Sequence, residues 1–276
     1  MSMNRFTGTG HSTTAARSKE FLADLLPSVI RRPLSAVDES APAPDEHLVS
    51  LLSPHTFEAE QYRSLRLVIE DRHKSTDLQV VAVSSACIGE GKTTTTINLA
   101  GALAQSKGAR VLLVDGDLRC SAVAARLGLD DKNRAGLAET LGEDEASLAS
   151  AIEAMPAWNL SVLRAGFCPE SPYERLLSPR FDRVIEAMRE SYDFIVIDCP
   201  PLLTVPDCRL MERSVDGFLL VVSAHQTPKK LLEEALNEIP REKLIGLIFN
   251  KDTRPLHGYY GRLSRYYAAR RAPSEI

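Results

Sequence analysis

An α/β fold, built as a doubly wound and mostly parallel sheet with helices on both faces, is predicted from three observations in this 276-residue sequence. First, short runs rich in Val, Ile and Leu alternate with segments long enough to form helices. Second, these runs are apolar at consecutive positions, as is typical of strands buried on both faces. Third, the composition is globular, with 44% hydrophobic and 25% charged residues. Strands joined by crossover helices pair in parallel, and the helices then cover both faces of the sheet.

The chain divides into three expected parts. A leader of residues 1–53 contains several prolines and little periodicity, which predicts disordered or weakly helical structure. The main domain is expected over residues 54–255, and a tail rich in tyrosine and arginine over 256–276. Six strands are expected in the main domain, at residues 78–83, 110–114, 160–163, 194–197, 217–222 and 244–249.

Charge and composition argue against several classes of protein. The net charge of -4 gives no bulk positive field, so no nucleic-acid partner is expected. No apolar stretch approaches the roughly 18 to 20 residues that cross a bilayer, and the polar N-terminus has no signal-like apolar region. A cytoplasmic chain is therefore expected. Its five cysteines include no C-x-x-C pair, which favours reduced thiols over disulfides or a zinc site.

A phosphate-binding loop follows the first expected strand. In the run ACIGEGKTTTT, Ala86, Gly91, Lys92 and Thr93 fit a Walker A pattern with Ala in place of the first Gly. Backbone N–H groups at the start of the next helix would surround phosphate oxygens, Lys92 would reach the β- and γ-phosphates, and Thr93 would ligate Mg²⁺. The candidate nucleotide-binding residues of this loop are Gly89, Glu90, Gly91, Lys92, Thr93 and Thr94.

Three carboxylates follow two later strands. Asp115 and Asp117 end the run VLLVDGD, and Asp198 ends FIVID. Ligands of a doubly wound sheet bind at the carboxyl ends of the strands, so these residues should meet the phosphate loop. Together they can supply Mg²⁺ ligands and a proton acceptor.

The segments SSACIGEGKTTTTINLAGALAQ, VLLVDGDLR and FIVIDCPP resemble the Walker A, Walker A′ and Walker B motifs of bacterial tyrosine kinases (BY-kinases). These are cytoplasmic P-loop ATPases of capsular and exopolysaccharide co-polymerase systems, and the similarity spans about residues 56–270. The resemblance implies an ATP- and Mg²⁺-dependent tyrosine autokinase that regulates polysaccharide polymerisation and export. It places Asn250, at the end of GLIFN, against adenine. The departures are Cys120 after Arg119, and DCPP where DTPP is common.

The chemistry of phosphoryl transfer suggests a division of roles among these residues, whereas the resemblance supports the set of residues more than the division. Lys92 would neutralise phosphate charge, Asp115 would accept the phenol proton, and Asp117, Asp198 and Thr93 would hold Mg²⁺, although Asp115 and Asp117 could exchange roles. The implied phosphate acceptors are the tail tyrosines Tyr259, Tyr260, Tyr266 and Tyr267.

The same family implies an assembly at the membrane. Glu60, Arg63 and Arg66 match its E-x-x-R-x-x-R helix, through which copies would form a ring. A membrane co-polymerase would act as activator and hold the cytoplasmic chain at the inner membrane, and a cognate tyrosine phosphatase would reverse the modification.

Several alternatives stay open at this stage. The chain could be a nucleotide-switched ATPase scaffold of the deviant Walker A type without kinase activity. The E-x-x-R-x-x-R residues could be an ordinary exposed salt-bridge face, and the tail could bind RNA or an anionic membrane. A partitioning ATPase is disfavoured because Cys87 occupies the position of the signature lysine.

Overall fold

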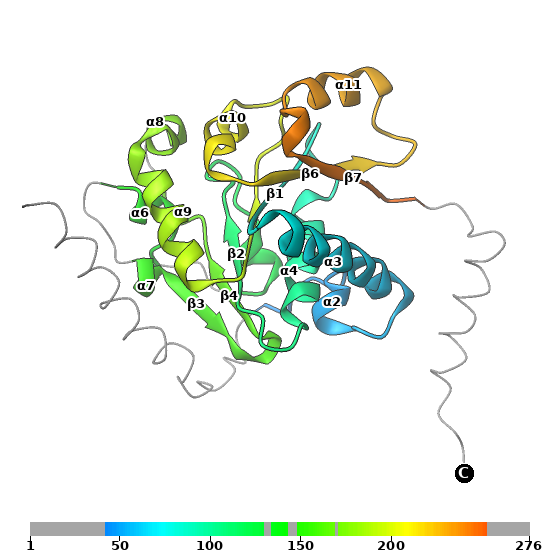
Figure 1. Ribbon diagram of the computed structural model, residues 1–276, viewed down its shortest axis with the longest axis horizontal. Coiled ribbons are helices and arrows are strands. Elements are labelled where there is room, and N and C mark those ends of the chain that lie inside the picture. The colour runs from blue at the N-terminus through cyan, green and yellow to red at the C-terminus, as the bar shows by residue number, and fades with distance from the viewer. Residues whose placement is uncertain (1–41, 130–133, 143–147, 169–170, 253–276) are drawn as a thin grey trace, which may run out of the picture. The chain divides into compact units, whose positions relative to one another are not determined.

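The computed structural model describes residues 42–129, 134–142, 148–168 and 171–252. Within them, seven strands form one sheet in the order β3-β4-β2-β5-β1-β6-β7 (Figure 1). The strands are β1 Val80–Ser85, β2 Val111–Asp115, β3 Ile152–Met155, β4 Leu160–Leu163, β5 Phe194–Asp198, β6 Gly217–Ser223 and β7 Leu244–Asn250. Neighbouring strands are parallel, apart from β3, which pairs antiparallel with β4. The predicted mostly parallel α/β sheet is confirmed.

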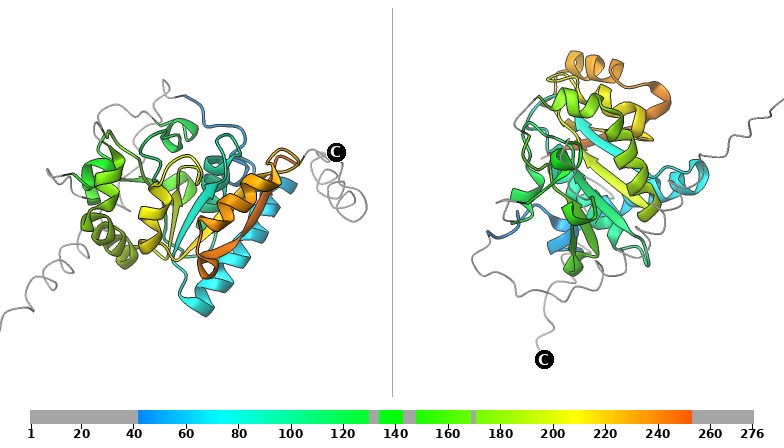
Figure 2. Two further views of the ribbon diagram at one scale, coloured as in Figure 1. Left: turned by 90° about the horizontal axis from the view of Figure 1, so that it is seen from above. Right: turned by 90° about the vertical axis from the view of Figure 1, so that its left-hand side faces the viewer.

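Helices cover both faces of this sheet (Figure 2). The α-helices are α2 Val49–Leu52, α3 Phe57–Thr76, α4 Lys92–Ala104, α5 Val123–Arg126, α6 Leu137–Thr140, α7 Leu148–Ala151, α8 Pro172–Leu177, α9 Pro179–Ser191, α10 Asp207–Met211 and α11 Lys229–Asn237. Three short 3₁₀ turns are η1 Pro156–Trp158, η2 Glu212–Ser214 and η3 Arg241–Lys243.

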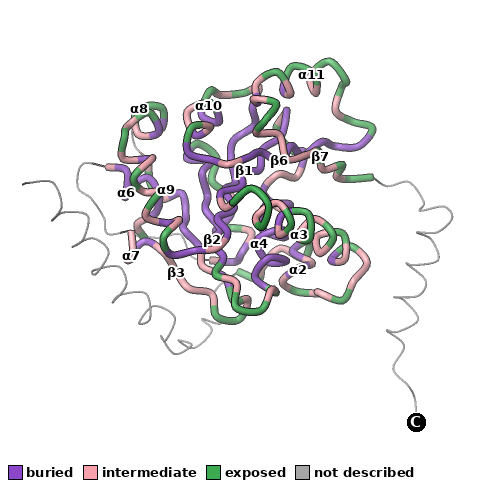
Figure 3. Tube along the Cα trace, in the orientation of Figure 1, coloured by how far each residue is buried: buried purple, intermediate pink, exposed green. Residues whose placement is uncertain are grey.

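Two apolar layers lie on either side of the strands, because successive strand residues point to opposite faces. Leu112 of β2 lies in the layer beneath α6, α8, α9, α10 and α11, whereas its neighbour Leu113 lies in the layer beneath α3, α4 and α5. The central strands are buried throughout, while α3 and α11 expose their outer faces (Figure 3). Burial on both faces explains why these strands are apolar at consecutive positions.

All six predicted strands are present, and none of their ends differs from the prediction by more than two residues. The seventh strand, β3, was not predicted. Its four residues, IEAM, are only partly buried and include Glu153, so they carry no apolar run. An antiparallel edge strand needs only one covered face, which leaves little trace in the sequence.

Residues 42–53, assigned above to the leader, pack against the main domain. The side chain of Asn98 in α4 accepts a hydrogen bond from the Ser50 N–H at 2.8 Å and donates to the carbonyl of His47 at 2.9 Å. Leu48 is fully buried beside Ile97 and Leu103 of α4 in the same apolar layer. The packed structure therefore begins earlier in the chain than the change in sequence texture at residue 54.

Two further expectations concern the cysteines and the membrane. In the part of the chain that the structure describes, no disulfide joins Cys87, Cys120, Cys168, Cys199 or Cys208. Among the helices that the structure describes, none combines the length and apolar character needed to span a bilayer.

Candidate functional site

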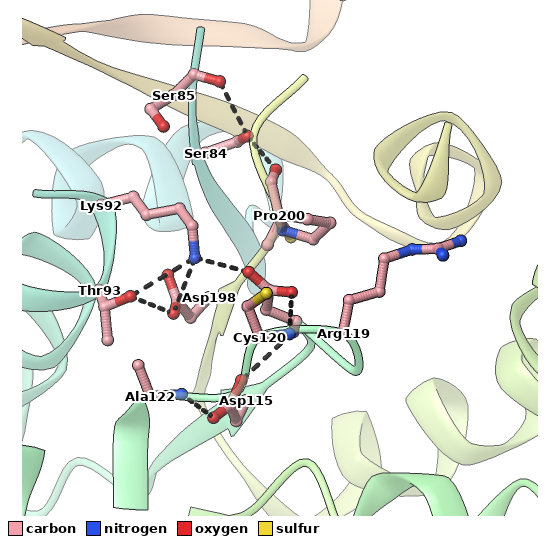
Figure 4. A network of polar contacts seen from close by, with 12 residues as sticks. Ser84, Ser85, Lys92, Thr93, Asp115, Arg119, Cys120, Ala122, Asp198 and Pro200 are labelled. Carbon is pink, nitrogen blue, oxygen red and sulfur yellow. Dashed lines mark hydrogen bonds and ion pairs between the residues drawn. The ribbon is translucent and has the colours of Figure 1, made fainter. Parts of the chain in front are cut away.

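The three predicted carboxylates meet the phosphate loop at one edge of the sheet. Figure 4 shows Asp115 and Asp198 near Lys92 and Thr93. The loop connects β1 to α4, and β1 pairs with β5, the strand that ends at Asp198. Strand β5 also pairs with β2, in a register that sets Asp198 directly opposite Asp115. Residues more than 80 positions apart are therefore brought together because parallel strands all end at the same edge.

The loop has the shape required to surround an anion. Gly91 lies at the N-cap of α4 with φ of +92°, and no side chain caps the helix there. The first-turn N–H groups of α4 thus carry no side-chain acceptor and form the positive end of the helix dipole. A phosphate group fits this arrangement, as it does at other helix N-termini that follow glycine loops.

Lys92, the first residue of α4, lies between two of the carboxylates. Its Nζ is 3.0 Å from Oδ2 of Asp117 and 3.4 Å from Oδ2 of Asp198. The Thr93 hydroxyl donates to the same Asp198 oxygen at 2.6 Å. One cation and one hydroxyl are therefore held within a single cluster with the acids that the sequence analysis assigned to magnesium.

Burial and mutual charge set the protonation of this cluster. Burial raises the pKa of Asp198, although Lys92 and Thr93 oppose that rise. Burial favours the neutral amine of Lys92, but the charges of Asp198 and Asp117 outweigh it and raise the pKa of Lys92. Lys92 therefore stays charged near neutral pH and can compensate phosphate charge.

Asp115 organises the segment that follows β2. Its carboxylate accepts hydrogen bonds from the N–H groups of Asp117 at 3.2 Å and of Ala122 and Val123 at 3.1 Å each. Burial and the charge of Asp198 raise the pKa of Asp115 to about 7, against the opposing effect of the Val123 N–H. A pKa near neutrality suits a general base, while the three backbone contacts suit a residue that shapes the loop.

The donor set fits a magnesium ion shared with phosphate. Thr93, Asp117 and Asp198 offer the hard oxygen ligands that Mg²⁺ prefers. Among the described residues, no group of three or more His, Cys, Asp or Glu side chains is arranged to hold a metal by itself. Magnesium sites that use one or two carboxylates together with substrate phosphates have this composition.

The other residues predicted to bind nucleotide, in the loop and at the end of β7, each have a defined position. The Thr94 carbonyl accepts from Asn98 within α4, and Gly89 lies at the exposed tip of the loop with φ of +83°. Asn250 ends β7 and donates from Nδ2 to the carbonyl of Glu90 at 2.9 Å. Glu90 is 4% exposed, and its carboxylate accepts hydrogen bonds from Cys87 and Thr227. Asn250 thus reaches the phosphate loop, and its contact with adenine stays a prediction.

Sequence reasoning missed three residues around the cluster. Thr96 donates to Oδ1 of Asp198 at 3.2 Å, and Arg119 forms a two-point ion pair with Asp207 at 2.8 and 3.0 Å. Thr96 and Arg119 stand inside the motifs already singled out, so a closer reading of those motifs could have found them. Asp207 stands in the run VPDCR, which carries no recognisable pattern.

The proposed assembly residues lie on α3, against α4. Arg63 pairs with Glu60 and donates to Oε1 of Gln105 at 3.3 Å, while Arg66 donates to the carbonyl of Ala102 at 3.1 Å. The three predicted side chains share one side of α3 and are partly exposed, and the two arginines link α3 to the C-terminal end of α4. The predicted acceptors Tyr259, Tyr260, Tyr266 and Tyr267 lie outside the described residues.

Comparison with known proteins agrees with this geometry. A family model described as an AAA domain matches residues 78–241. Tyrosine-protein kinase YwqD of Bacillus subtilis is 34% identical over 220 residues, which cover 78% of this chain and 91% of that protein. Succinoglycan biosynthesis transport protein ExoP of Rhizobium meliloti is 31% identical over 80% of this chain, but only 28% of ExoP is covered.

A solved structure shows the same fold. The crystal structure of the chimerical protein CapA2B2 aligns with a TM-score of 0.70 and 27% identity, over 78% of this chain and 96% of that one. The sheet, the phosphate loop with its three carboxylates, and the extent of the match to YwqD all lead to one assignment. The chain belongs to the bacterial tyrosine-protein kinases, P-loop enzymes of capsule and exopolysaccharide biosynthesis.

Proposed function

We propose that this kinase transfers the γ-phosphate of ATP to tyrosines of its own C-terminal cluster, Tyr259, Tyr260, Tyr266 and Tyr267. The observation that carries the proposal is the convergence of Lys92 and Thr93 with Asp117 and Asp198 at the phosphate loop. That set matches the needs of phosphoryl transfer, in which the protein mainly positions groups and compensates charge.

The proposed transfer step forms one bond, breaks another and moves one proton to a carboxylate of the site. The tyrosine Oη forms a bond to the γ-phosphorus, the bond from that phosphorus to the β-phosphate oxygen breaks, and ADP leaves. The phenol proton passes to a carboxylate, for which Asp115 is the first candidate and Asp117 the second. Lys92 stabilises the negative charge of the transferring group from the start of α4. Magnesium, held by Thr93, Asp117 and Asp198, would supply further charge neutralisation at the phosphates.

The proposed partners follow from the relatives. ExoP is named a biosynthesis transport protein, which supports a membrane co-polymerase as the activator of this chain. Through that partner the chain would lie at the cytoplasmic face of the inner membrane, with a tyrosine phosphatase reversing its modification. No nucleic-acid partner is proposed.

Self-assembly is proposed to use α3. Next to Glu60, Arg63 and Arg66, the same helix exposes the apolar side chains of Leu67 and Val68, at 59% and 49%. Neighbouring exposed apolar residues at a polar motif are typical of a contact surface. Sedimentation velocity of Leu67→Ser with Val68→Ser, beside the wild type, tests this: unchanged assembly would contradict the role of α3.

Mass spectrometry before and after incubation with Mg–ATP tests the kinase proposal. Phosphate should map to the tail tyrosines in the wild type, should be lost in Lys92→Met, and should be lost when all four tyrosines become Phe. A phosphate-free wild type that hydrolyses ATP, even with its membrane partner bound, would contradict the autokinase and favour the nucleotide-switched scaffold.

A further inference from the structure

We propose that Glu90 and Thr227 form a positioning pair that holds the phosphate loop in the shape that receives a nucleotide. This role depends on the proposed binding of a nucleoside triphosphate at the loop. Glu90 lies within the loop, and Thr227 lies 137 residues later, between β6 and α11. Neither side chain is assigned a contact with nucleotide or metal; both act through the backbone of the loop.

The Glu90 side chain fastens the loop at two points. Its Oε2 accepts a hydrogen bond from the backbone N–H of Cys87 at 2.8 Å, which closes the turn around Ile88 and Gly89. Its Oε1 receives a hydrogen bond from the hydroxyl of Thr227. One carboxylate therefore fixes both the local turn and its attachment to a distant segment.

The direction of the Thr227 hydrogen bond follows from its other contact. Its Oγ1 accepts from the backbone N–H of Ser223, the last residue of β6, at 3.0 Å. A hydroxyl carries a single proton, so the proton of Thr227 is directed at Glu90. The loop is thereby tied through one threonine to the end of β6, the strand that lies between β1 and β7.

The backbone at Glu90 is held from the neighbouring strand as well. Asn250 donates to the Glu90 carbonyl, and Nζ of Lys251 donates to the Gly89 carbonyl at 2.5 Å. These two residues stand at and just after the end of β7. The side chain and the backbone of Glu90 are thus both held by hydrogen bonds.

Burial of the Glu90 carboxylate is costly. Within the part of the chain that the structure describes, no Lys, Arg or His nitrogen lies within 4.0 Å of either oxygen. A buried carboxylate without a cationic partner opposes folding unless its hydrogen bonds compensate. The two hydrogen bonds that compensate here both shape the phosphate loop, so we attribute the burial of this side chain to preorganisation of the loop.

Nucleotide affinity provides the test, measured as the Kd of a fluorescent ATP analogue with Mg²⁺ on the full chain. Glu90→Ala and Thr227→Val should each weaken binding by about tenfold, the scale of one lost hydrogen bond of this kind. Thr227→Ser should recover most of the affinity because it keeps the hydroxyl. Glu90→Gln should recover most of it too, since an amide can accept from Cys87 and donate to Thr227.

Two comparisons separate positioning from other roles. The double variant Glu90→Ala with Thr227→Val should bind about as well as either single variant, because both remove one shared connection. Glu233→Ala, an exposed change on α11, is the matched control for loss of a carboxylate. Thermal unfolding without nucleotide checks that each variant is folded. If Glu90→Ala does not fold, Thr227→Val still tests the proposal, because Thr227 lies on a partly exposed loop.

The outcomes distinguish this role from the proposed function. If the wild type binds the nucleotide and both Glu90→Ala and Thr227→Val bind it with the same affinity, the positioning pair is overturned but the proposed function is not. Glu90→Gln as weak as Glu90→Ala also overturns it, because the charge itself would then act on the nucleotide or its metal. A folded wild type that does not bind the Mg–ATP analogue removes the proposed function, and the positioning role with it.

Discussion

Arg119 and Asp207 join the segment after β2 to the first residue of α10 through a two-point ion pair. Asp207 is fully buried, whereas the Arg119 side chain is 34% exposed. Arg119 stands two residues after Asp117, so the pair helps to position the segment that carries this site carboxylate. The planar guanidinium provides both hydrogen bonds at a fixed angle.

We therefore expect Arg119→Ala to lower the free energy of unfolding by about 3 kcal/mol, because it leaves a buried carboxylate without its cation. Arg119→Lys should recover part of this loss, since an amine cannot reproduce the two-point contact. Chemical unfolding measures the effect. Arg209→Ala, on α10 with a more exposed ion pair to Glu238, is the control and should cost about 1 kcal/mol or less. Equal losses in both variants would contradict the special position of Asp207.

The phosphate loop allows a comparison between glycines. A Cβ at Gly91 would lie 2.1 Å from Nδ2 of Asn250, and the backbone there has φ of +92°, whereas a Cβ at Gly89 meets nothing within 4 Å. Gly91→Ala should therefore abolish nucleotide binding. Gly89→Ala should weaken the free energy of nucleotide binding only by the backbone strain, about 1 to 2 kcal/mol. Calorimetric titration with ATP and Mg²⁺ measures both.

Gly246→Ala is the control for these variants, because a Cβ there also meets nothing within 4 Å and its φ is not positive. Its nucleotide affinity should stay within about twofold of the wild type. Gly91→Ala that binds nucleotide as well as Gly89→Ala would show that Asn250 can move aside.

Thr93 and Thr96 both donate to Asp198, but only Thr93 is assigned to the metal. Thr93→Val should raise the Mg²⁺ concentration for half-maximal ATPase activity by about tenfold, since it removes a metal ligand. Thr96→Val removes a longer contact with the same carboxylate, at 3.2 Å against 2.6 Å for Thr93, and should change that concentration much less. Activity assayed over a magnesium series gives the answer. Similar shifts in both variants would mean that the hydrogen bond to Asp198, rather than ligation by Thr93, is what matters.

A pH-dependent contribution is expected from Asp216, far from the metal cluster. Burial alone would raise its pKa, but hydrogen bonds from Arg189, Val80 and Gln79 outweigh burial and hold the pKa below its usual range. The ionised carboxylate thus stabilises the fold above the ordinary pKa of about 3.8, and this stabilisation disappears as the pH falls through the lower folded value.

Asp216→Asn should accordingly be less stable than the wild type by about 1 to 2 kcal/mol at pH 7 and at pH 5. The difference should shrink below pH 4. Urea unfolding at pH 7, 5 and 3 measures it, with Asp77→Asn at the exposed end of α3 as the control for removal of a carboxylate. A difference that is the same at pH 5 and pH 3 would exclude the ionised state of Asp216 as its cause.

The sequence by itself determined the sheet and the chemistry of its edge. Six of the seven strands followed from consecutive apolar residues, because burial on both faces leaves a local pattern. Lys92, Thr93, Asp115, Asp117 and Asp198 followed from the glycine loop and from acids at strand ends. Parallel strands end at one edge, so the meeting of these residues was already implied by the strand pattern.

Tertiary structure alone decided how that edge is held in place. Arg119 meets Asp207 across 88 residues, Glu90 meets Thr227 across 137, and the packing of residues 42–53 on α4 likewise joins distant segments. Strand β3 is an edge strand with a mixed pattern. Such contacts depend on how the chain folds back on itself. A single buried Asp or loop Thr forms no periodic pattern in the sequence, so its partner cannot be predicted from the sequence alone.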